Sequence, residues 1–155
     1  MDPIEEKLKE LGLELPNPPV PAASYLPFRI NGTTLILSGV ISARDGVTIH
    51  AGQVGKEQTV ESGFLAAQVC ALNTLAGIKL ALGRLDRVRE FLLVSGFVNA
   101  VAGFDQSPQV INGASDLFLK LYGEQGKHAR AAVAVAGLPR NATVEIQVTV
   151  TYKGP

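Results

Sequence analysis

The stretch that decides the fold is ARAAVAVAGLPRNATVEIQVTVTY, residues 129–152. Two runs of small and β-branched residues alternate in character with a period of two, on either side of a turn at Leu138-Pro139. This period is typical of β-strands. The stretch therefore predicts two strands paired as a hairpin. The register of that pairing would separate Arg130 from Glu145 by about 20 Å within one chain.

The two faces of the predicted hairpin differ in their side chains. One face would carry the β-branched residues and pack against helices. The other would carry Arg130, several alanines, Glu145 and threonines. A row of small residues favours close packing against another surface, most simply a second subunit. We therefore expect a homo-oligomer, in which Arg130 of one subunit could approach Glu145 of its neighbour.

The remainder of the chain alternates strand and helix patterns. Asn31-Gly32 is a strong two-residue hairpin signal, and Thr59 is a candidate N-cap for the longest apolar helix. The expected strands are 26–31, 33–40, 47–51 and 89–100, and the expected helices are 59–82 and 108–122. The order predicts an α+β fold, with one mostly antiparallel sheet of about six strands and two helices on one face.

The N-terminal segment has a different composition. Residues 3–12 carry the start and stop signals of a short helix. Pro16, Pro18, Pro19 and Pro21 then favour an extended connector. We therefore divide the chain into 1–21, an N-terminal helix with a proline-rich arm, and 22–155, a single domain.

Composition excludes several classes of function. The 155 residues include 14 basic and 14 acidic side chains, so no concentrated basic face for nucleic acid is expected. Cys70 is the only cysteine and His50 and His128 the only histidines, which indicates no disulfide and no metal site. We found neither a signal-peptide stretch nor an apolar run of about 18 residues to cross a membrane. We expect a cytoplasmic protein without a cofactor.

Specific motifs resemble the Rid (YjgF) family of reactive-intermediate deaminases, whose older members are labelled endoribonuclease L-PSP. The C-terminal block Ala129-Arg130-Ala131-Ala132-Val133, Leu138-Pro139 and Val144-Glu145-Ile146 carries most of the resemblance. Tyr25, Ser38-Gly39 and Asn112 agree with further family positions. The resemblance covers about residues 22–153 and leaves out the N-terminal helix, which indicates a divergent subgroup.

The resemblance implies a chorismate-mutase-like fold assembled as a homotrimer with clefts between subunits. It also implies hydrolysis of 2-imino or enamine acids to 2-keto acids and ammonia, without a cofactor. Arg130 would clamp the substrate carboxylate and Glu145 would act as acid/base. The implied lining of the cleft is Tyr25, Ser38, Gly39, Asn112, the backbone of Ala132, and His128. His128 and Ala132 depart from the usual family residues, and His128 could alter substrate choice.

Alternatives remain at the level of the sequence. The same clefts could belong to a non-catalytic protein that binds small carboxylates, or the chain could be an endoribonuclease. Arg130 could form a structural ion pair at an interface, and Asn112 could cap its helix. Tyr25 could only pack under the arm, and Ser38 could only stabilise a turn.

Overall fold

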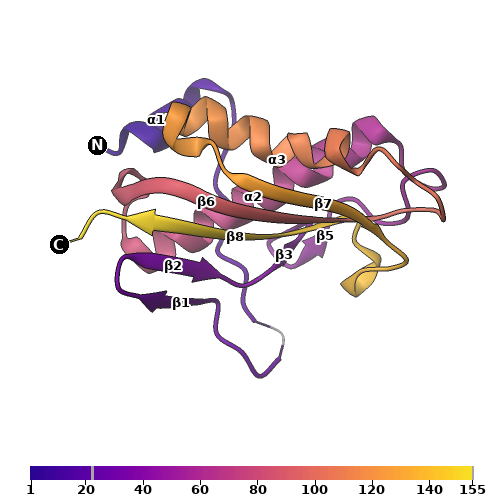
Figure 1. The fold of residues 1–155 in the computed structure, drawn as a ribbon, viewed down its shortest axis with the longest axis horizontal. Helices are drawn as coiled ribbons and strands as arrows, with labels where there is room; N and C mark the ends of the chain where they lie inside the picture. The colour runs from indigo at the N-terminus through magenta and orange to yellow at the C-terminus, as the bar shows by residue number, and fades with distance from the viewer. Residues whose placement is uncertain (22, 155) are drawn as a thin grey trace.

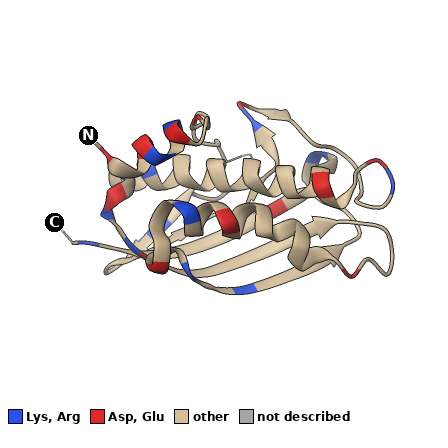
Figure 2. Ribbon diagram, turned by 90° about the horizontal axis from the view of Figure 1, so that it is seen from above, with Lys and Arg blue, Asp and Glu red and all other residues tan. Residues whose placement is uncertain are grey.

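The computed structural model describes residues 1–21 and 23–154, which form a sheet covered on one face by helices. Figure 1 shows α3 along the β7 edge of the sheet, and Figure 2 shows the two long helices side by side on one side of the strands. The elements are α1 (Pro3–Glu10), β1 (Phe28–Asn31), β2 (Thr34–Leu37), β3 (Val40–Ile41), β4 (Ala43–Arg44), β5 (Val47–Thr48), α2 (Val60–Leu82), β6 (Val88–Asn99), α3 (Ser107–Tyr122), β7 (Ala129–Val135) and β8 (Val144–Tyr152), with short 3-10 turns at Leu85–Arg87, Gly123–Gly126 and Pro139–Asn141. The predicted α+β class is confirmed.

Strand β6 lies near the centre of the sheet, whose order is β1-β2-β8-β6-β7, with the short β3 also paired to β8. Only β6 and β7 run parallel, because α3 crosses over between them. The other pairs are antiparallel. The predicted sheet of about six mostly antiparallel strands is therefore confirmed, and β4 and β5 form a separate small ribbon.

The predicted hairpin between β7 and β8 is wrong. Strand β6 lies between them, with Val94 opposite Arg130 on one side and Phe97 opposite Glu145 on the other. The 12-residue β6 offers a long, largely apolar strand that pairs along both edges. A period-two pattern identifies strands without naming their neighbours, so it could not exclude this insertion. The predicted separation of about 20 Å between Arg130 and Glu145 assumed this hairpin. That prediction is therefore wrong as well.

The assignment of faces in β7 is also wrong. Arg130 and Ala132 pair with Val94 and Gly96, both buried under the helices, whereas Val133 is 47% exposed on the opposite face. In β8 the prediction is confirmed, because Val144, Ile146, Val148 and Val150 are all buried. Arg130 and Glu145 consequently lie on opposite faces of the sheet.

Helix α2 forms the centre of the helical layer. Thr59 caps its N-terminus as predicted, in a reciprocal capping box with Ser62, and Gly83 ends it in the left-handed conformation. By length and composition α2 could cross a membrane, but 61% of its most apolar window is buried inside the protein. Such burial is what a helix in a folded core shows.

Helix α1 packs on the same core as the rest of the chain. Ile4 and Leu8 are buried, and the Asp2 carboxylate accepts hydrogen bonds from the amides of Ile4 (2.9 Å) and Leu85 (2.6 Å). The backbone then passes through the proline arm. The amide of Asn17 donates to Asp45 (3.0 Å), which ties the arm to the turn between β4 and β5.

Candidate functional site

The residues expected at the site gather in two places rather than one. Arg130, Asn112 and His128 lie together where β7 faces α3. Tyr25, Gly39 and Glu145 line a second cavity beside the proline arm. The two groups are built on opposite faces of the sheet.

Arg130 is held against α3 by three acceptors. One terminal nitrogen of its guanidinium donates to Oδ1 of Asn112 (2.8 Å) and to Oγ of Ser115 (3.2 Å), and the other donates to the carbonyl of Pro108 (3.4 Å). The side chain of Asn112 therefore orients Arg130. It does not cap α3, whose N-cap is Gln106.

Arg130 carries an unneutralised positive charge. Among residues 1–21 and 23–154, the ion pairs are Lys56–Glu57, Lys79–Glu5, Arg84–Asp86 and Lys127–Glu124. No carboxylate of the described chain therefore pairs with Arg130. A guanidinium whose partners are neutral retains its affinity for an external carboxylate or phosphate.

His128 and Ser115 extend the Arg130 group. Nε2 of His128 lies 2.8 Å from Oγ of Ser115, and Nδ1 lies 2.7 Å from the carbonyl of Gly126. Burial lowers the pKa of His128, with a smaller contribution from the charge of Arg130. Sequence reasoning did not find Ser115. Its position three residues after Asn112 on one helix was the available signal, because such residues share a face.

A cavity of about 310 Å³ opens beside this group and is lined by Ser115, Leu119, Lys127, His128 and Arg130. Lys127 pairs with Glu124 at 2.8 Å on the exposed rim. The cavity therefore combines the unpaired cation of Arg130 with a neutral imidazole and one hydroxyl. The expected contribution of Ala132 lies in its backbone, and its half-buried side chain packs against the core.

The second cavity, of about 580 Å³, contains Glu145. Its lining comprises Asn17, Pro18, Pro19, Val20, Tyr25, Gly39, Val40, Ile41, Ala43, Asp45, Gly46, Asn73, Pro139, Arg140 and Glu145. Partial burial raises the pKa of Glu145 above its ordinary value. A Cβ atom at Gly39 would overlap Oε2 of Glu145, so the glycine allows the Glu145 carboxylate to lie in this position.

Tyr25 borders the Glu145 cavity, whereas Ser38 makes hydrogen bonds within the chain. Tyr25 is 50% exposed and borders the Glu145 cavity, with the arm residues Pro18 and Pro19. The Ser38 hydroxyl donates to the carbonyl of Leu26 at 2.5 Å, and its amide donates to the carbonyl of Pro27 at 3.0 Å. In this chain Ser38 therefore holds the turn that carries Tyr25, and it borders a smaller neighbouring cavity.

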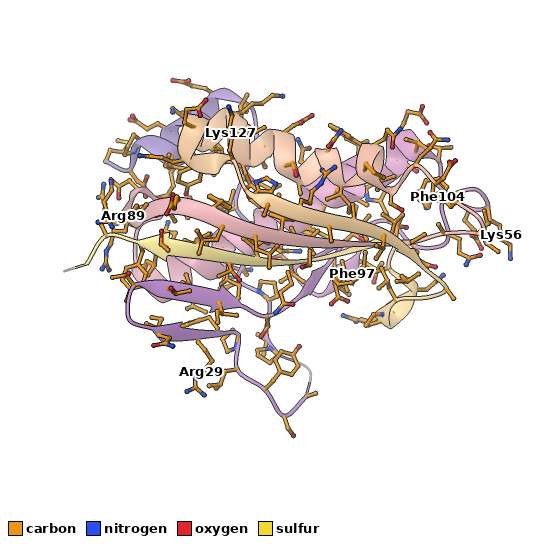
Figure 3. The ribbon with its side chains drawn as sticks, in the orientation of Figure 1. Arg29, Lys56, Arg89, Phe97, Phe104 and Lys127 are labelled. Carbon is orange, nitrogen blue, oxygen red and sulfur yellow. The ribbon has the colours of Figure 1, made fainter. Side chains whose placement is uncertain are left out.

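The sheet face opposite the helices carries exposed apolar side chains. Val133 (47%), Leu93 (43%) and Ile36 (43%) lie on it, beside half-buried Phe97, which Figure 3 labels toward the right-hand end of the sheet. Phe97 is directly opposite both Val133 and Glu145 in the register. The face that presents Glu145 is thus the apolar one.

Charged side chains are mixed over the surface. Figure 2 shows acidic and basic positions interspersed along the helices and loops, with no continuous basic stripe in the part of the chain it colours. The described residues also contain no cluster of three or more histidine, cysteine, aspartate or glutamate side chains that could hold a metal ion.

Comparison with known proteins identifies the family. Residues 5–150 match the family model described as "YjgF/chorismate_mutase-like, putative endoribonuclease". The chain belongs to the Rid/YjgF family. The match begins inside α1, so it includes most of the N-terminal helix that the resemblance in sequence had left out.

Three relatives resemble this Rid/YjgF chain over nearly its whole length. Protein TCP17 of Trypanosoma cruzi is 40% identical over 148 residues, 95% of this chain and 92% of the relative. The structure of Atu1372 from Agrobacterium tumefaciens, a protein of unknown function, is 44% identical with a TM-score of 0.90, covering 97% of this chain and 94% of the other. A "putative endoribonuclease" from Shewanella oneidensis is 31% identical with a TM-score of 0.92, covering 96% and 98%.

Proposed function

We propose that this protein hydrolyses small 2-imino or enamine acids to 2-keto acids and ammonia. The observation that carries the proposal is the Arg130 guanidinium, oriented by Asn112 at the mouth of a cavity and left without a carboxylate partner in the described chain. Membership of the Rid/YjgF family supports a role on small molecules of this kind. Glu145, whose pKa is raised, supplies the acid/base group.

The chemistry needs little beyond positioning and proton transfer. Arg130 binds the substrate carboxylate through charge-assisted hydrogen bonds. Glu145 accepts a proton from water as the oxygen attacks the electrophilic imine carbon and passes it to the nitrogen, forming a carbinolamine. Glu145 then carries the hydroxyl proton to the nitrogen as the carbon–nitrogen bond breaks, so the nitrogen leaves as ammonia and the carbon retains the oxygen as a ketone. A carboxyl of raised pKa suits this exchange at neutral pH.

Two copies of the chain form each site in this proposal. One copy contributes Arg130, Asn112 and the backbone of Ala132, and the next contributes Glu145, Gly39 and Tyr25. The placement of the two groups on opposite sheet faces supports this division, because the 310 Å³ cavity is lined by Arg130 without Glu145 and the 580 Å³ cavity by Glu145 without Arg130. The apolar face around Phe97 supports a closed homotrimer that buries it.

The test measures release of ammonia and pyruvate from freshly generated 2-aminoacrylate, with and without purified protein. We expect acceleration over buffer that Arg130→Ala lowers by at least about 100-fold, because the substrate loses its carboxylate anchor. Arg29→Ala is the matched control, since Arg29, labelled in Figure 3, is exposed on β1 and is not among the residues that line either cavity. No acceleration with several imino acids would overturn the proposal.

The same experiment separates a non-catalytic carboxylate-binding protein from the enzyme. The three neutral acceptors that already hold Arg130 are equally suited to a protein that only binds. Such a protein would be stabilised thermally by pyruvate in the wild type and in Glu145→Gln, without turnover in either. A wild type that turns over and a glutamine variant that binds but does not turn over decide for the deaminase.

An endoribonuclease has weaker support from the structure. The name occurs in the family description and in a relative, but the interspersed charges in Figure 2 provide no phosphate track. We expect purified protein to leave a mixed single-stranded RNA uncleaved. Cleavage that disappears in Arg130→Ala would favour the nuclease.

A further inference from the structure

Ser115 and His128 stand beside Arg130, and the hydrolysis proposed above uses neither of their side chains. Their hydrogen bonds have a defined direction. A carbonyl oxygen only accepts, so Nδ1 of His128 carries the proton donated to Gly126 at 2.7 Å. Nε2 then has a lone pair, and the Ser115 hydroxyl donates to it at 2.8 Å. Arg130 donates to the oxygen of that hydroxyl at 3.2 Å.

Charges around the imidazole favour its neutral form when the cavity is empty. The guanidinium of Arg130 opposes a second positive charge, and burial under α3 opposes any charge. Of the other charged groups nearby, Lys127 and Glu124 pair with each other at 2.8 Å, and Asp116 is exposed on α3. The edge of the Phe118 ring faces the imidazole, with ring centroids 6.2 Å apart.

A carboxylate bound to Arg130 reverses this balance. It neutralises the guanidinium and adds a negative charge beside the imidazole, so proton binding at His128 becomes more favourable. Protonated Nε2 donates to Oγ of Ser115, which has two lone pairs and can accept from His128 and Arg130 together. The Ser115 hydroxyl then no longer donates a hydrogen bond to Nε2, and its proton can point into the cavity.

We propose that Ser115 and His128 complete the Arg130 site as a proton donor, so that a small carboxylate bound there takes up a proton at His128 and receives a hydrogen bond from Ser115. This inference rests on the proposed function, because it concerns the same cavity. It specifies the ligand class: acids with a hydrogen-bond acceptor next to the carboxylate, such as 2-keto and 2-imino acids. A 2-amino acid is rejected, because its ammonium group has no lone pair and is repelled by both cations.

During turnover the relay protonates the substrate. The Ser115 proton passes to the imine nitrogen while the Nε2 proton of His128 passes to Oγ, so the imidazole returns to its neutral form. Protonation makes the imine carbon more electrophilic, and Glu145 receives the proton lost by water. Glu145 passes this proton on to the nitrogen, which now carries three hydrogens and leaves as ammonia. The hydroxyl proton of the adduct goes to the Glu145 carboxylate and then to solvent, the carbon becomes a ketone, and no external oxidant or reductant is required.

Isothermal titration calorimetry tests the proton uptake. Pyruvate is titrated into the wild-type protein near the ordinary pKa of histidine, about pH 6.5, in buffers of different ionisation enthalpy. We expect the observed binding enthalpy to vary linearly with the ionisation enthalpy of the buffer. The slope gives the number of protons taken up per site, and we expect it to be a fraction of one. His128→Gln should bind pyruvate with zero slope. His50→Gln, which replaces the other histidine, should retain the wild-type slope.

Selectivity tests the hydroxyl separately. Wild type should bind pyruvate about tenfold more tightly than propionate, which lacks the acceptor. Ser115→Ala should bring the two affinities within about twofold of each other, and neither protein should bind alanine. If the His128→Gln variant does not fold, Ser115→Ala still tests the inference, because replacing serine with alanine changes the side-chain volume little.

The outcomes separate this inference from the proposed function. Pyruvate binding without proton uptake in the wild type overturns the inference and leaves deamination standing. Proton-coupled binding with no turnover of any imino acid supports the inference and removes deamination. No pyruvate binding by the wild type overturns the inference, and the ammonia assay then decides on deamination by itself.

Discussion

Arg130 and Glu145 are both half-buried charged groups without an ion-pair partner in the described chain. Arg130 is half-buried against neutral acceptors, and Glu145 is half-buried with a raised pKa. Neither arrangement is what folding alone would favour, since a partly buried charge without a partner costs free energy. Such groups are typical of functional sites.

Replacing Glu145 with glutamine should therefore separate stability from activity. Because the folded-state pKa of Glu145 is raised, the folded protein binds its proton more tightly than the unfolded chain does, and stability falls as pH rises from about 4.5 through the raised value. At neutral pH the glutamine variant should melt at a higher temperature than the wild type, and the difference should vanish at more acidic pH. Turnover should fall by at least about 100-fold.

The measurement is thermal unfolding from pH 4 to pH 8 beside the ammonia assay. Glu10→Gln, which removes an exposed charge at the end of α1, is the control and should change neither. Equal melting temperatures for wild type and Glu145→Gln at all pH values would show that burial of this carboxylate costs nothing in the folded protein.

At the scale of elements, the site depends on how closely α3 approaches α2. A Cβ atom at Gly113 would overlap the backbone carbonyl of Phe64 in α2. Gly113 lies between Asn112 and Ser115 in sequence, so the same helix turn that allows the close contact also presents both partners of Arg130. Packing of the two helices thereby sets the position of the guanidinium.

Gly113→Ala should consequently impair both stability and activity. Overpacking of this kind costs about 2–3 kcal/mol, and displacement of α3 should loosen the Asn112–Arg130 hydrogen bond. Gly77→Ala is a matched helical control, because the added Cβ in α2 meets only Leu37 at 3.4 Å. It should be neutral or stabilising by up to about 1 kcal/mol. Denaturant unfolding and the ammonia assay measure the two effects.

The N-terminal helix is attached by a buried carboxylate. Asp2 is 4% exposed and accepts from Ile4 within α1 and from Leu85 in the turn after α2. Asp2→Ala should cost about 2 kcal/mol, because it removes a helix cap and leaves the buried Leu85 amide without its acceptor. Asp2→Asn retains an acceptor oxygen and should cost less. Urea unfolding of both variants measures this difference, and equal losses would contradict the capping role.

At the scale of the whole molecule, the apolar sheet face and the separated site groups lead to one arrangement. A surface with Val133, Leu93 and Ile36 exposed favours association. In the proposed site, association through that face also brings the Glu145 of one copy toward the Arg130 cavity at the β7 edge of another. Oligomerisation and completion of the site are then the same event.

Two inactive variants should therefore complement each other. In the proposed ring, each site uses Arg130 of one copy and Glu145 of the next. A Glu145→Gln copy still supplies Arg130, and an Arg130→Ala copy still supplies Glu145. A mixed ring therefore has an active site wherever a Glu145→Gln copy is followed by an Arg130→Ala copy. Random mixing of equal amounts makes about a quarter of the sites active. The measurement is the ammonia assay on co-refolded variants, with each variant refolded alone as the control. A mixture no more active than its components would place both residues in one chain's site.

Several elements could be predicted from local sequence because their signals are local. Thr59 with the apolar run after it predicted α2. Asn31-Gly32 predicted a turn between β1 and β2, which the structure places one residue later, at Gly32-Thr33. The sequence block around Arg130 and Glu145 indicated the family. The match of the family model to residues 5–150 confirms it. Asn112 was expected at the site, and the structure shows its side chain accepting a hydrogen bond from Arg130.

What the sequence by itself determined was the class of the fold, most of its strands and helices, and the family, since these follow from period, capping and motif spacing along the chain. The same motifs supplied the residues that we propose carry the chemistry. Only the tertiary structure decided that β6 separates β7 from β8, that Arg130 faces α3, and that Ser115 and His128 meet beside it. The reason is physical. Strand partners and faces are chosen by long-range burial, and an alternating strand is equally compatible with either neighbour and either face until the whole core is assembled.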